Sequence, residues 1–312
     1  MIALADRYRG CLLGLACGDA VGTTVEFSPR GSFEPLTDMV GGGPFGLLAG
    51  QWTDDTSMAL CLASSLLHCG GFDAVDQMNR YVNWWHWGYY SATNECFDIG
   101  MTVAKALQNY QVTQDPMSGS TDPQTAGNGA LMRLAPAVLA YHPWTDEVMK
   151  YARLSSQTTH AAPEALDCSA LFGELISRAL RGLPKEHLLQ ADRCLLSTPA
   201  TQALKEVRYL DKPMDAIVGS GYCVASLEAA LWCFAKTNSF LDAVLLAANL
   251  GDDADTTAAI VGQLAGAHYG VAGIPSRWLQ RLHMRGEIER LALALYDQAS
   301  ARESPTPVEL TL

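Results

Sequence analysis

Residues 251–270 read "GDDADTTAAIVGQLAGAHYG", a cluster of acids and threonines followed by an apolar run in which small residues recur. The first predicted helix has the same small-residue spacing at Ala5, Gly10, Gly14 and Gly18. Glycine inside a helix costs about 1 kcal/mol relative to alanine, so glycine at this spacing usually marks a close contact between helices. Both segments are therefore expected to be helices packed tightly against neighbouring helices.

Apolar residues at helical spacing recur along most of the chain, whereas alternating β-branched runs joined by hairpin turns are missing. We expect one helix at the start of the chain and another directly after the acidic residues at 53–55. Further helices are expected over 72–87, 98–111, 128–141, 163–181, 221–236, 239–250, 255–269 and 285–299. The fold class is predicted to be all-α, with about ten or more helices. Residues 1–300 are expected to form a single compact domain, and the proline-broken residues 301–312 a flexible tail.

The composition excludes several classes of protein. A hydrophobic fraction of 49% with 17% charged residues indicates a folded chain with a large core. A formal net charge of −12 argues against sequence-independent nucleic-acid binding, although backbone N–H groups could still hold a phosphorylated ligand. The nine cysteines show no zinc or disulfide pattern, which predicts a reducing, cytoplasmic location. No signal peptide or membrane span is recognisable.

The segment "QWTDDTSMAL", beginning at residue 51, resembles the acidic cluster at 252–256, and the two are called the acidic phrases below. The two phrases share acids and threonines at a predicted helix start: Thr53, Asp54 and Asp55 in the first, and Asp253, Asp255 and Thr256 in the second. One reading is helix capping, since such side chains accept hydrogen bonds from free N–H groups. The other is a cation site, because gathered carboxylates repel one another unless hard cations such as Mg²⁺, Mn²⁺ or Ca²⁺ neutralise them. If the two helix starts meet, a two-cation site is predicted.

Three further acids are candidates. Gly18 and Asp19 are expected to end the first helix, where Asp19 would cap a turn. Glu26 lies between Val25 and Phe27 and either faces solvent or lines a pocket. Asp98 is expected at the start of a helix, again between apolar neighbours.

Two glycine-rich segments are candidates for binding an anion. Gly127, Asn128 and Gly129 are expected to lead directly into a helix, where free N–H groups could face a phosphate. The segment "GSGYCVASLEAALW", residues 219–232, repeats this design, and its Tyr222 either stacks on a ring or packs in the core. His160 in "SSQTTHAAPEA" is either a hydrogen-bonded structural residue or a catalytic one.

These segments together resemble the ADP-ribosylglycohydrolase family, in particular its bacterial branch typified by the dinitrogenase reductase-activating glycohydrolase. The resemblance rests on seven motifs in order: "GCLLGLACGDAVGTTVEF", "GGGPFGLLAGQWTDDTSMAL", "CFDIGMTV", "AGNGALMR", "TTHAAPEA", "SGYCVASLEAALW" and "GDDADTTAAIVGQLAGAHYG". It implies an all-α domain with a cleft that holds two Mg²⁺ or Mn²⁺ ions. Asp252 departs from the pattern, since many members have a second glycine there.

The resemblance also implies roles for individual residues. The metal ligands would be Thr53, Asp54, Asp55, Asp253, Asp255 and Thr256. The residues around the diphosphate or ribose would be Gly127, Asn128, Gly129, Met132, His160, Ser220, Gly221 and Tyr222. The catalytic acids would be Asp98, Glu26 and Asp55, with Asp98 proposed for proton transfer at the ribose and Glu26 approaching the metals.

The implied activity is hydrolysis of the bond between ribose and a modified protein side chain, most often arginine, with release of ADP-ribose. Such an enzyme reverses mono-ADP-ribosylation, including modification by a toxin. The alternatives are a hydrolase for O-acetyl-ADP-ribose, serine-linked or nucleic-acid-linked ADP-ribose, or a non-catalytic protein that binds ADP-ribose or a toxin. The intact acidic triplets favour catalysis. Glu34 is the only candidate for the mobile glutamate of the serine-specific branch, which disfavours serine linkages.

Overall fold

The computed structural model describes residues 2–302, and every regular element in that range is helical, which confirms the all-α prediction. The α-helices are α1 (Leu4–Gly22), α2 (Asp54–His68), α3 (Ala74–Trp87), α4 (Met101–Thr113), α5 (Ala135–Tyr141), α6 (Thr145–Gln157), α7 (Pro163–Leu180), α8 (Lys185–Leu188), α9 (Pro199–Lys205), α10 (Cys223–Lys236), α11 (Phe240–Ala248), α12 (Ala254–Tyr269), α13 (Ser276–Arg281) and α14 (Arg285–Ala301). Short 3₁₀ turns and loops connect them.

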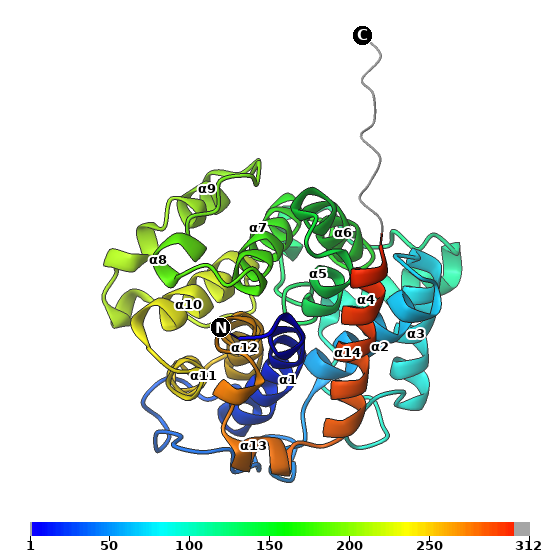
Figure 1. Ribbon diagram of the computed structural model, residues 1–312. Helices are drawn as coiled ribbons and strands as arrows, with labels where there is room; N and C mark the ends of the chain where they lie inside the picture. The colour runs from blue at the N-terminus through cyan, green and yellow to red at the C-terminus, as the bar shows by residue number, and fades with distance from the viewer. Residues whose placement is uncertain (1, 303–312) are drawn as a thin grey trace.

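The helices α1 and α12 lie side by side in the centre of the molecule (Figure 1). A Cβ atom on Gly10 would lie 2.3 Å from the carbonyl oxygen of Gly266, and one on Gly14 would lie 2.2 Å from that of Gly262. The series continues with Gly18 against Ala258 and Gly22 against Ala254. The numbers fall along α12 as they rise along α1, so the helices are antiparallel and their backbones touch. The small-residue spacing in the sequence therefore marks one shared contact.

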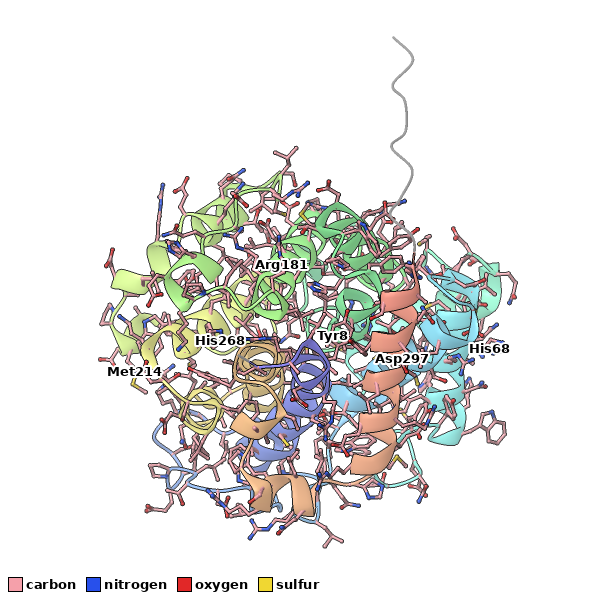
Figure 2. All side chains as sticks on the ribbon, viewed as in Figure 1. Tyr8, His68, Arg181, Met214, His268 and Asp297 are labelled. Atoms are coloured by element: carbon pink, nitrogen blue, oxygen red, sulfur yellow. The ribbon has the colours of Figure 1, made fainter. Side chains whose placement is uncertain are left out.

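Other helices surround this pair, and their side chains fill the space between the ribbons (Figure 2). Tyr8 on α1 illustrates the packing: its hydroxyl donates to the carbonyl oxygen of Leu139 on α5, at 3.0 Å. Its ring also meets the ring of Tyr296 on α14 edge-on, with 5.4 Å between the centroids. The central helix pair is thereby fixed against both α5 and α14.

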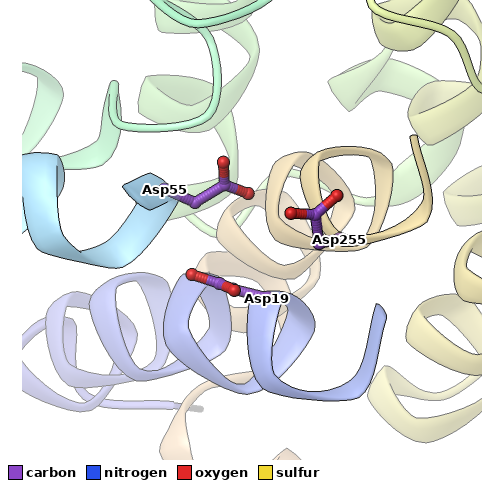
Figure 3. Close-up of side chains that lie close together, drawn as sticks. All are labelled: Asp19, Asp55 and Asp255. Atoms are coloured by element: carbon purple, nitrogen blue, oxygen red, sulfur yellow. The ribbon is translucent and has the colours of Figure 1, made fainter. Parts of the chain in front are cut away.

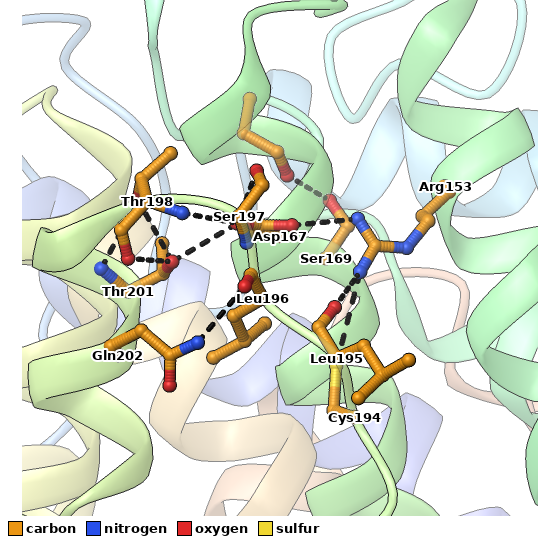
Figure 4. A network of polar contacts seen from close by, with 11 residues as sticks. Arg153, Asp167, Ser169, Cys194, Leu195, Leu196, Ser197, Thr198, Thr201 and Gln202 are labelled. Carbon is orange, nitrogen blue, oxygen red and sulfur yellow. Dashed lines mark hydrogen bonds and ion pairs between the residues drawn. The ribbon is translucent and has the colours of Figure 1, made fainter.

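The segment between α8 and α9 has little regular structure and is held by a buried carboxylate on α7 (Figure 4). Asp167 accepts hydrogen bonds from the Arg153 guanidinium at 2.8 Å, the Ser197 hydroxyl at 2.9 Å and the Thr201 hydroxyl at 3.0 Å. Burial opposes ionisation, but these donors hold the pKa of Asp167 below its usual value. The charged form is therefore the one that fixes the segment.

Several predicted boundaries are wrong. The first helix does not end at Gly18 and Asp19 but runs to Gly22, because Gly18 is a contact glycine and not a C-cap. Of the helix predicted over 128–141, only Ala135–Tyr141 is helical, and the segment before it forms turns. The helix predicted from residue 98 starts at Met101, and α6 was not predicted.

Among the described residues, no helix combines the length and the hydropathy needed to cross a membrane. All nine cysteines are free thiols, most of them buried. The division into a domain over 1–300 and a tail over 301–312 stays a prediction: Ala301 ends α14, and residues 303–312 lie outside the described part of the chain.

The contact between α1 and α12 generates a stability prediction. A methyl group in Gly14→Ala would meet backbone atoms of α12 that cannot move independently, so we expect a loss of about 1–3 kcal/mol in the free energy of unfolding. The measurement is urea-induced unfolding followed by circular dichroism. The matched control is Gly286→Ala in α14, where no atom lies within 4 Å of the added Cβ, so the variant should be as stable as the wild type or more so. Equal stability of the two variants would contradict the backbone contact.

Candidate active site

The two helix starts with the repeated acidic phrase lie against each other. The hydroxyl of Thr53, just before α2, lies 3.3 Å from Asp255 Oδ2 on α12 and 3.0 Å from Asp19 Oδ1 on α1, so it shares its one hydrogen between the two carboxylates. Thr256 on α12 donates to Asp55 Oδ1 on α2 at 3.2 Å. All of these side chains are buried. Each phrase thus supplies a hydroxyl donor for one carboxylate of the other, across some 200 residues of chain.

The other oxygen atoms of these carboxylates are left without partners. Asp55 Oδ2 and Asp255 Oδ1 are buried and accept no hydrogen bond from any residue between 2 and 302. The side chains of Thr53 and Asp253 do not cap the helices that they precede, so capping does not explain the phrases. Burial, followed by repulsion from neighbouring carboxylates, raises the pKa values of Asp54, Asp55 and Asp255 well above normal.

A third acid belongs to this cluster and was assigned the wrong role from sequence. Asp19 on α1 faces Asp55 and Asp255, and one carboxylate oxygen from each lies within 4.8 Å of the others (Figure 3). Both Asp19 oxygens are occupied: Oδ1 accepts from the N–H (2.9 Å) and hydroxyl (3.0 Å) of Thr53, and Oδ2 from the N–H (3.0 Å) and hydroxyl (2.6 Å) of Thr56. Asp19 therefore caps the N-terminus of α2 from a different helix. Burial raises its pKa to about 6 although these donors oppose the shift.

The cluster fits a hard divalent cation. Its donors are carboxylate and hydroxyl oxygens, which Mg²⁺ and Mn²⁺ prefer, and two carboxylate oxygens have no hydrogen-bond partner within residues 2–302. Buried carboxylates that cannot all be ionised together become stable as anions when a cation neutralises them. The clustering therefore supports a metal site; which of the six predicted residues bind directly stays a prediction.

Two more carboxyl groups extend the cluster along the cavity. Glu26 and Asp98 each place an oxygen within 4.8 Å of one from Asp255. Burial and the neighbouring acids, Asp98 first among them, raise the pKa of Glu26 to about 9. Burial and Asp19 raise that of Asp98 to about 7. Of the two readings of Glu26, the structure supports the pocket carboxylate, since only 4% of the residue is exposed.

Asp98 does not occupy the predicted helix start. It lies three residues before α4 in a loop, with φ of +60°, which is uncommon for a residue with a side chain. The backbone turns sharply here and directs the carboxyl group into the cavity. No hydrophobic pattern predicts such a conformation.

These acids line a cavity of about 380 Å³. The predicted site residues that line it are Glu26, Asp54, Asp98, Gly127, Asn128, Gly129, Met132, His160, Gly221, Asp253, Asp255 and Thr256. Thr53, Asp55, Ser220 and Tyr222 are not among the lining residues. Sequence reasoning missed a wall of the cavity formed by Ile99, Gly100, Met101, Thr102 and Val103, together with Phe27; only the motif around Asp98 pointed toward that wall.

The glycine-rich segment at 127–129 connects to the acidic cluster through Asn128. Its side-chain amide donates to Asp253 Oδ2 at 2.7 Å and to the Ser226 hydroxyl at 3.2 Å, and its backbone N–H donates to the carbonyl oxygen of Gly221 at 3.0 Å. The expected helix start is wrong here, because the turns at 128–134 separate this segment from α5. Asn128 thus holds the segment against the start of α12.

His160 explains why residues 127 and 129 are glycine. A Cβ atom on Gly129 would lie 2.8 Å from the imidazole ring, and one on Gly127 would lie 3.2 Å from it. On the His160 ring, the nitrogen Nδ1 lies 2.9 Å from the Thr159 hydroxyl. Burial, and then the charge of Arg133, lower the pKa of His160 to about 3. The imidazole is neutral at physiological pH.

Tyr222 and Glu34 lie away from the cavity lining. The hydroxyl of Tyr222 donates to Glu164 on α7 at 2.7 Å, so its side chain is directed toward that helix. Its backbone forms an isolated β-bridge with Gly127, which joins the two glycine-rich segments. Glu34 is exposed and is not among the lining residues.

A model of the ADP-ribosylglycohydrolase family matches residues 1–305. The chain belongs to this family. It is 47% identical to the "ADP-ribosylarginine hydrolase Tri1" of Pseudomonas putida (strain GB-1), over 94% of this chain and 79% of that protein. It is 32% identical to the "ADP-ribosyl-[dinitrogen reductase] glycohydrolase" of Rhodospirillum rubrum, over 91% of this chain and 92% of that protein.

A solved structure gives the same result for the fold. The structure of an "ADP-ribosylglycohydrolase-related protein complex" superposes on this one with a TM-score of 0.84 at 46% identity, and covers 95% of this chain and 99% of the solved chain. The family membership and the helical fold inferred from the seven motifs are both confirmed.

The cluster generates a prediction about metal binding. Mn²⁺ added to chelator-treated protein should raise the melting temperature, because a ligand at 100 times its dissociation constant stabilises the folded state by about 2.7 kcal/mol. Asp255→Asn should lose most of this rise, since it removes a carboxylate with an unpartnered oxygen. Differential scanning fluorimetry is the measurement, and Asp297→Asn, an exposed position on α14, is the matched control. A full rise in Asp255→Asn would contradict a metal site at this cluster.

Proposed function

We propose that this protein is a metal-dependent hydrolase that removes ADP-ribose from modified arginine side chains and so reverses mono-ADP-ribosylation. The observation that carries the proposal is the pair of reciprocal threonine–aspartate contacts between the starts of α2 and α12. Beside them, within the described residues, buried carboxylate oxygens without hydrogen-bond partners adjoin an acidic cavity. The printed name of the relative at 47% identity supports arginine as the linkage.

Two Mg²⁺ or Mn²⁺ ions are the proposed cofactors. They would be held by Thr53, Asp54, Asp55, Asp253, Asp255 and Thr256. When bound, such ions neutralise the carboxylates and polarise the ribose hydroxyls and a water. Asp19 fixes the geometry: by capping α2 it holds Thr53 and Thr56 in place.

Glu26 and Asp98 are the proposed proton-transfer groups. Both line the cavity and both have raised pKa values, about 9 and about 7, so a carboxyl group here retains a proton near neutral pH. One of them would protonate the departing guanidine nitrogen or the ribose ring oxygen, and the other would accept a proton from the attacking water. The ribose–nitrogen bond breaks, an oxygen–carbon bond forms, and ADP-ribose and unmodified arginine are the products. Direct displacement and a ring-opened route share this proton balance.

The anionic diphosphate needs partners other than basic side chains, because no lysine or arginine is among the residues that line the cavity. We assign this role to the backbone around Gly127 and Gly129, with His160 as a neutral neighbour. Asn128 would act by holding this segment against Asp253. Met132, Ser220, Gly221 and Tyr222 complete the proposed binding segments.

The alternatives concern linkage and catalysis. Hydrolysis of O-acetyl-ADP-ribose or of serine- or nucleic-acid-linked ADP-ribose would use the same metals, and Glu34 is exposed and outside the lining. A non-catalytic ADP-ribose- or toxin-binding protein would not require the buried acids. The proposed partners are an ADP-ribosylated protein as substrate and ADP-ribose as product. The free cysteines fit the proposed cytoplasmic location.

Catalysis should require a divalent cation. ADP-ribose release from an ADP-ribosyl-arginine protein should stop in EDTA and return with Mg²⁺ or Mn²⁺. Asp54→Ala or Asp255→Ala should reduce kcat/KM by at least about 10³-fold, since each removes charge from the cluster. Release is measured by chromatography of the free nucleotide. Full activity in EDTA would contradict the metal mechanism.

The linkage is tested with paired substrates. Arginine-linked and serine-linked ADP-ribosyl peptides and O-acetyl-ADP-ribose are compared at equal concentration, and the arginine-linked peptide should have the highest kcat/KM. Asp297→Asn, at an exposed position on α14, is the control variant and should show the same kcat/KM values as the wild type. Faster release from the serine-linked peptide would overturn the choice of linkage, and binding of ADP-ribose without any turnover would support the non-catalytic alternative.

A further inference from the structure

Three phenylalanine rings form a row beside the acidic cavity. The ring of Phe27 meets that of Phe45 edge-on, with 6.4 Å between the centroids and 74° between the planes. The ring of Phe45 in turn lies 5.1 Å from that of Phe97. Phe27 lines the cavity and is 66% exposed, so its ring is accessible to a ligand.

The row is built next to the two carboxyl groups proposed for proton transfer. Glu26 directly precedes Phe27, and Asp98 directly follows Phe97. Both acids line the cavity, so at each end of the row an acid that faces the reaction lies beside a ring in the sequence. Phe27 is the member of the row that lines the cavity, where it borders the part in which the ribose–nitrogen bond would break; Phe45 and Phe97 are not among the lining residues.

The backbone holds Phe27 in a costly conformation. Its φ is +61°, in the left-handed region, which costs a residue with a side chain roughly 1–2 kcal/mol. Phe27 N–H donates to the carbonyl oxygen of Asp252 at 2.7 Å, and Asp252 N–H donates to that of Ser28 at 2.8 Å. Phe27 is thus held next to Asp253 at the start of α12. Strain and exposure at one fixed residue indicate a functional constraint on it.

The aromatic ring of Phe27 and the carboxyl groups near it select the ligand. The ionisable lining residues are Glu26, Asp54, Asp98, Asp253 and Asp255, together with His160, whose imidazole is neutral. An aromatic face attracts a planar cation, and a guanidinium both stacks on rings and donates hydrogen bonds to carboxyl oxygens. A neutral acetyl or seryl group has no comparable attraction to such a surface.

We propose that Phe27, the cavity-lining member of the row Phe27–Phe45–Phe97, stacks against the guanidinium group of the arginine that carries ADP-ribose and thereby sets the preference for arginine linkages. This inference rests on the proposed function. It concerns the side of the cavity occupied by the leaving group, which is distinct from the segments assigned to the diphosphate.

The test compares Phe27→Leu, Phe27→Gly and Phe27→Tyr on an ADP-ribosyl-arginine peptide. Phe27→Leu keeps an apolar side chain without the aromatic face, so KM should rise by about five- to thirty-fold. The affinity for free ADP-ribose, measured by calorimetry, should stay within about twofold. Phe27→Tyr retains the ring and should restore the wild-type KM. Val112→Ala, at an exposed position near the end of α4, is the matched surface control.

Phe27→Gly separates a binding role from a structural one. Glycine relieves the positive φ, so its melting temperature should equal or exceed that of the wild type while its KM rises as in Phe27→Leu. A wild-type KM in Phe27→Leu, or an equal loss of affinity for ADP-ribose, would overturn the guanidinium site. If the wild type releases nothing from the arginine-linked peptide, the proposed function itself fails, before any variant is compared.

Discussion

The arrangement of this site depends on glycines that allow the backbones of α1 and α12 to touch. A Cβ atom on Gly22 would lie 2.4 Å from the Asp255 Cα atom, so the end of α1 touches the start of α12 at the position of the second acidic phrase. Glycine weakens each helix locally, but it allows backbones to approach within a distance that no larger residue permits. Asp19, one turn before Gly22, is thereby placed beside Asp255.

Asp19 extends this constraint to a third helix. Its carboxylate accepts two backbone N–H groups and two hydroxyls at the start of α2, and so replaces the cap that Thr53 would otherwise supply. The Thr53 hydroxyl lies between Asp19 and Asp255 and shares its one hydrogen with both carboxylates, and Asp55 is brought within reach of Thr256. The buried acids have no lysine or arginine beside them among the cavity residues. Such a cluster is unfavourable as a set of anions and becomes favourable when a cation is bound.

The sequence predicted the helical class from apolar periodicity. The repeated acidic composition raised a shared cation site only as one of two readings, and the resemblance to the family was what implied that the two segments meet. The sequence did not predict the role of Asp19. Glycine followed by aspartate is typical of a helix end, and only the tertiary contact of Gly18 with Ala258 makes this glycine a helix-interior residue. The turns at 128–134 were missed because their apolar residues are buried as those of a helix would be. The conformation of Asp98 is set by the surrounding loop and leaves no mark in the hydrophobic pattern.

The site divides its tasks between helices and loops. Asp19, Asp55 and Asp255 lie in helices whose backbones pack together, so their spacing cannot adjust without disturbing the core. Phe27, Asp98 and Asp252 lie in loops, and all three have φ near +60°. Strained loop residues can be exchanged without altering the helix contacts, whereas the helical acids cannot. A family that keeps one metal cluster and varies its substrates would therefore be expected to change these loops first, and it is in the loops that the aromatic row of this protein lies.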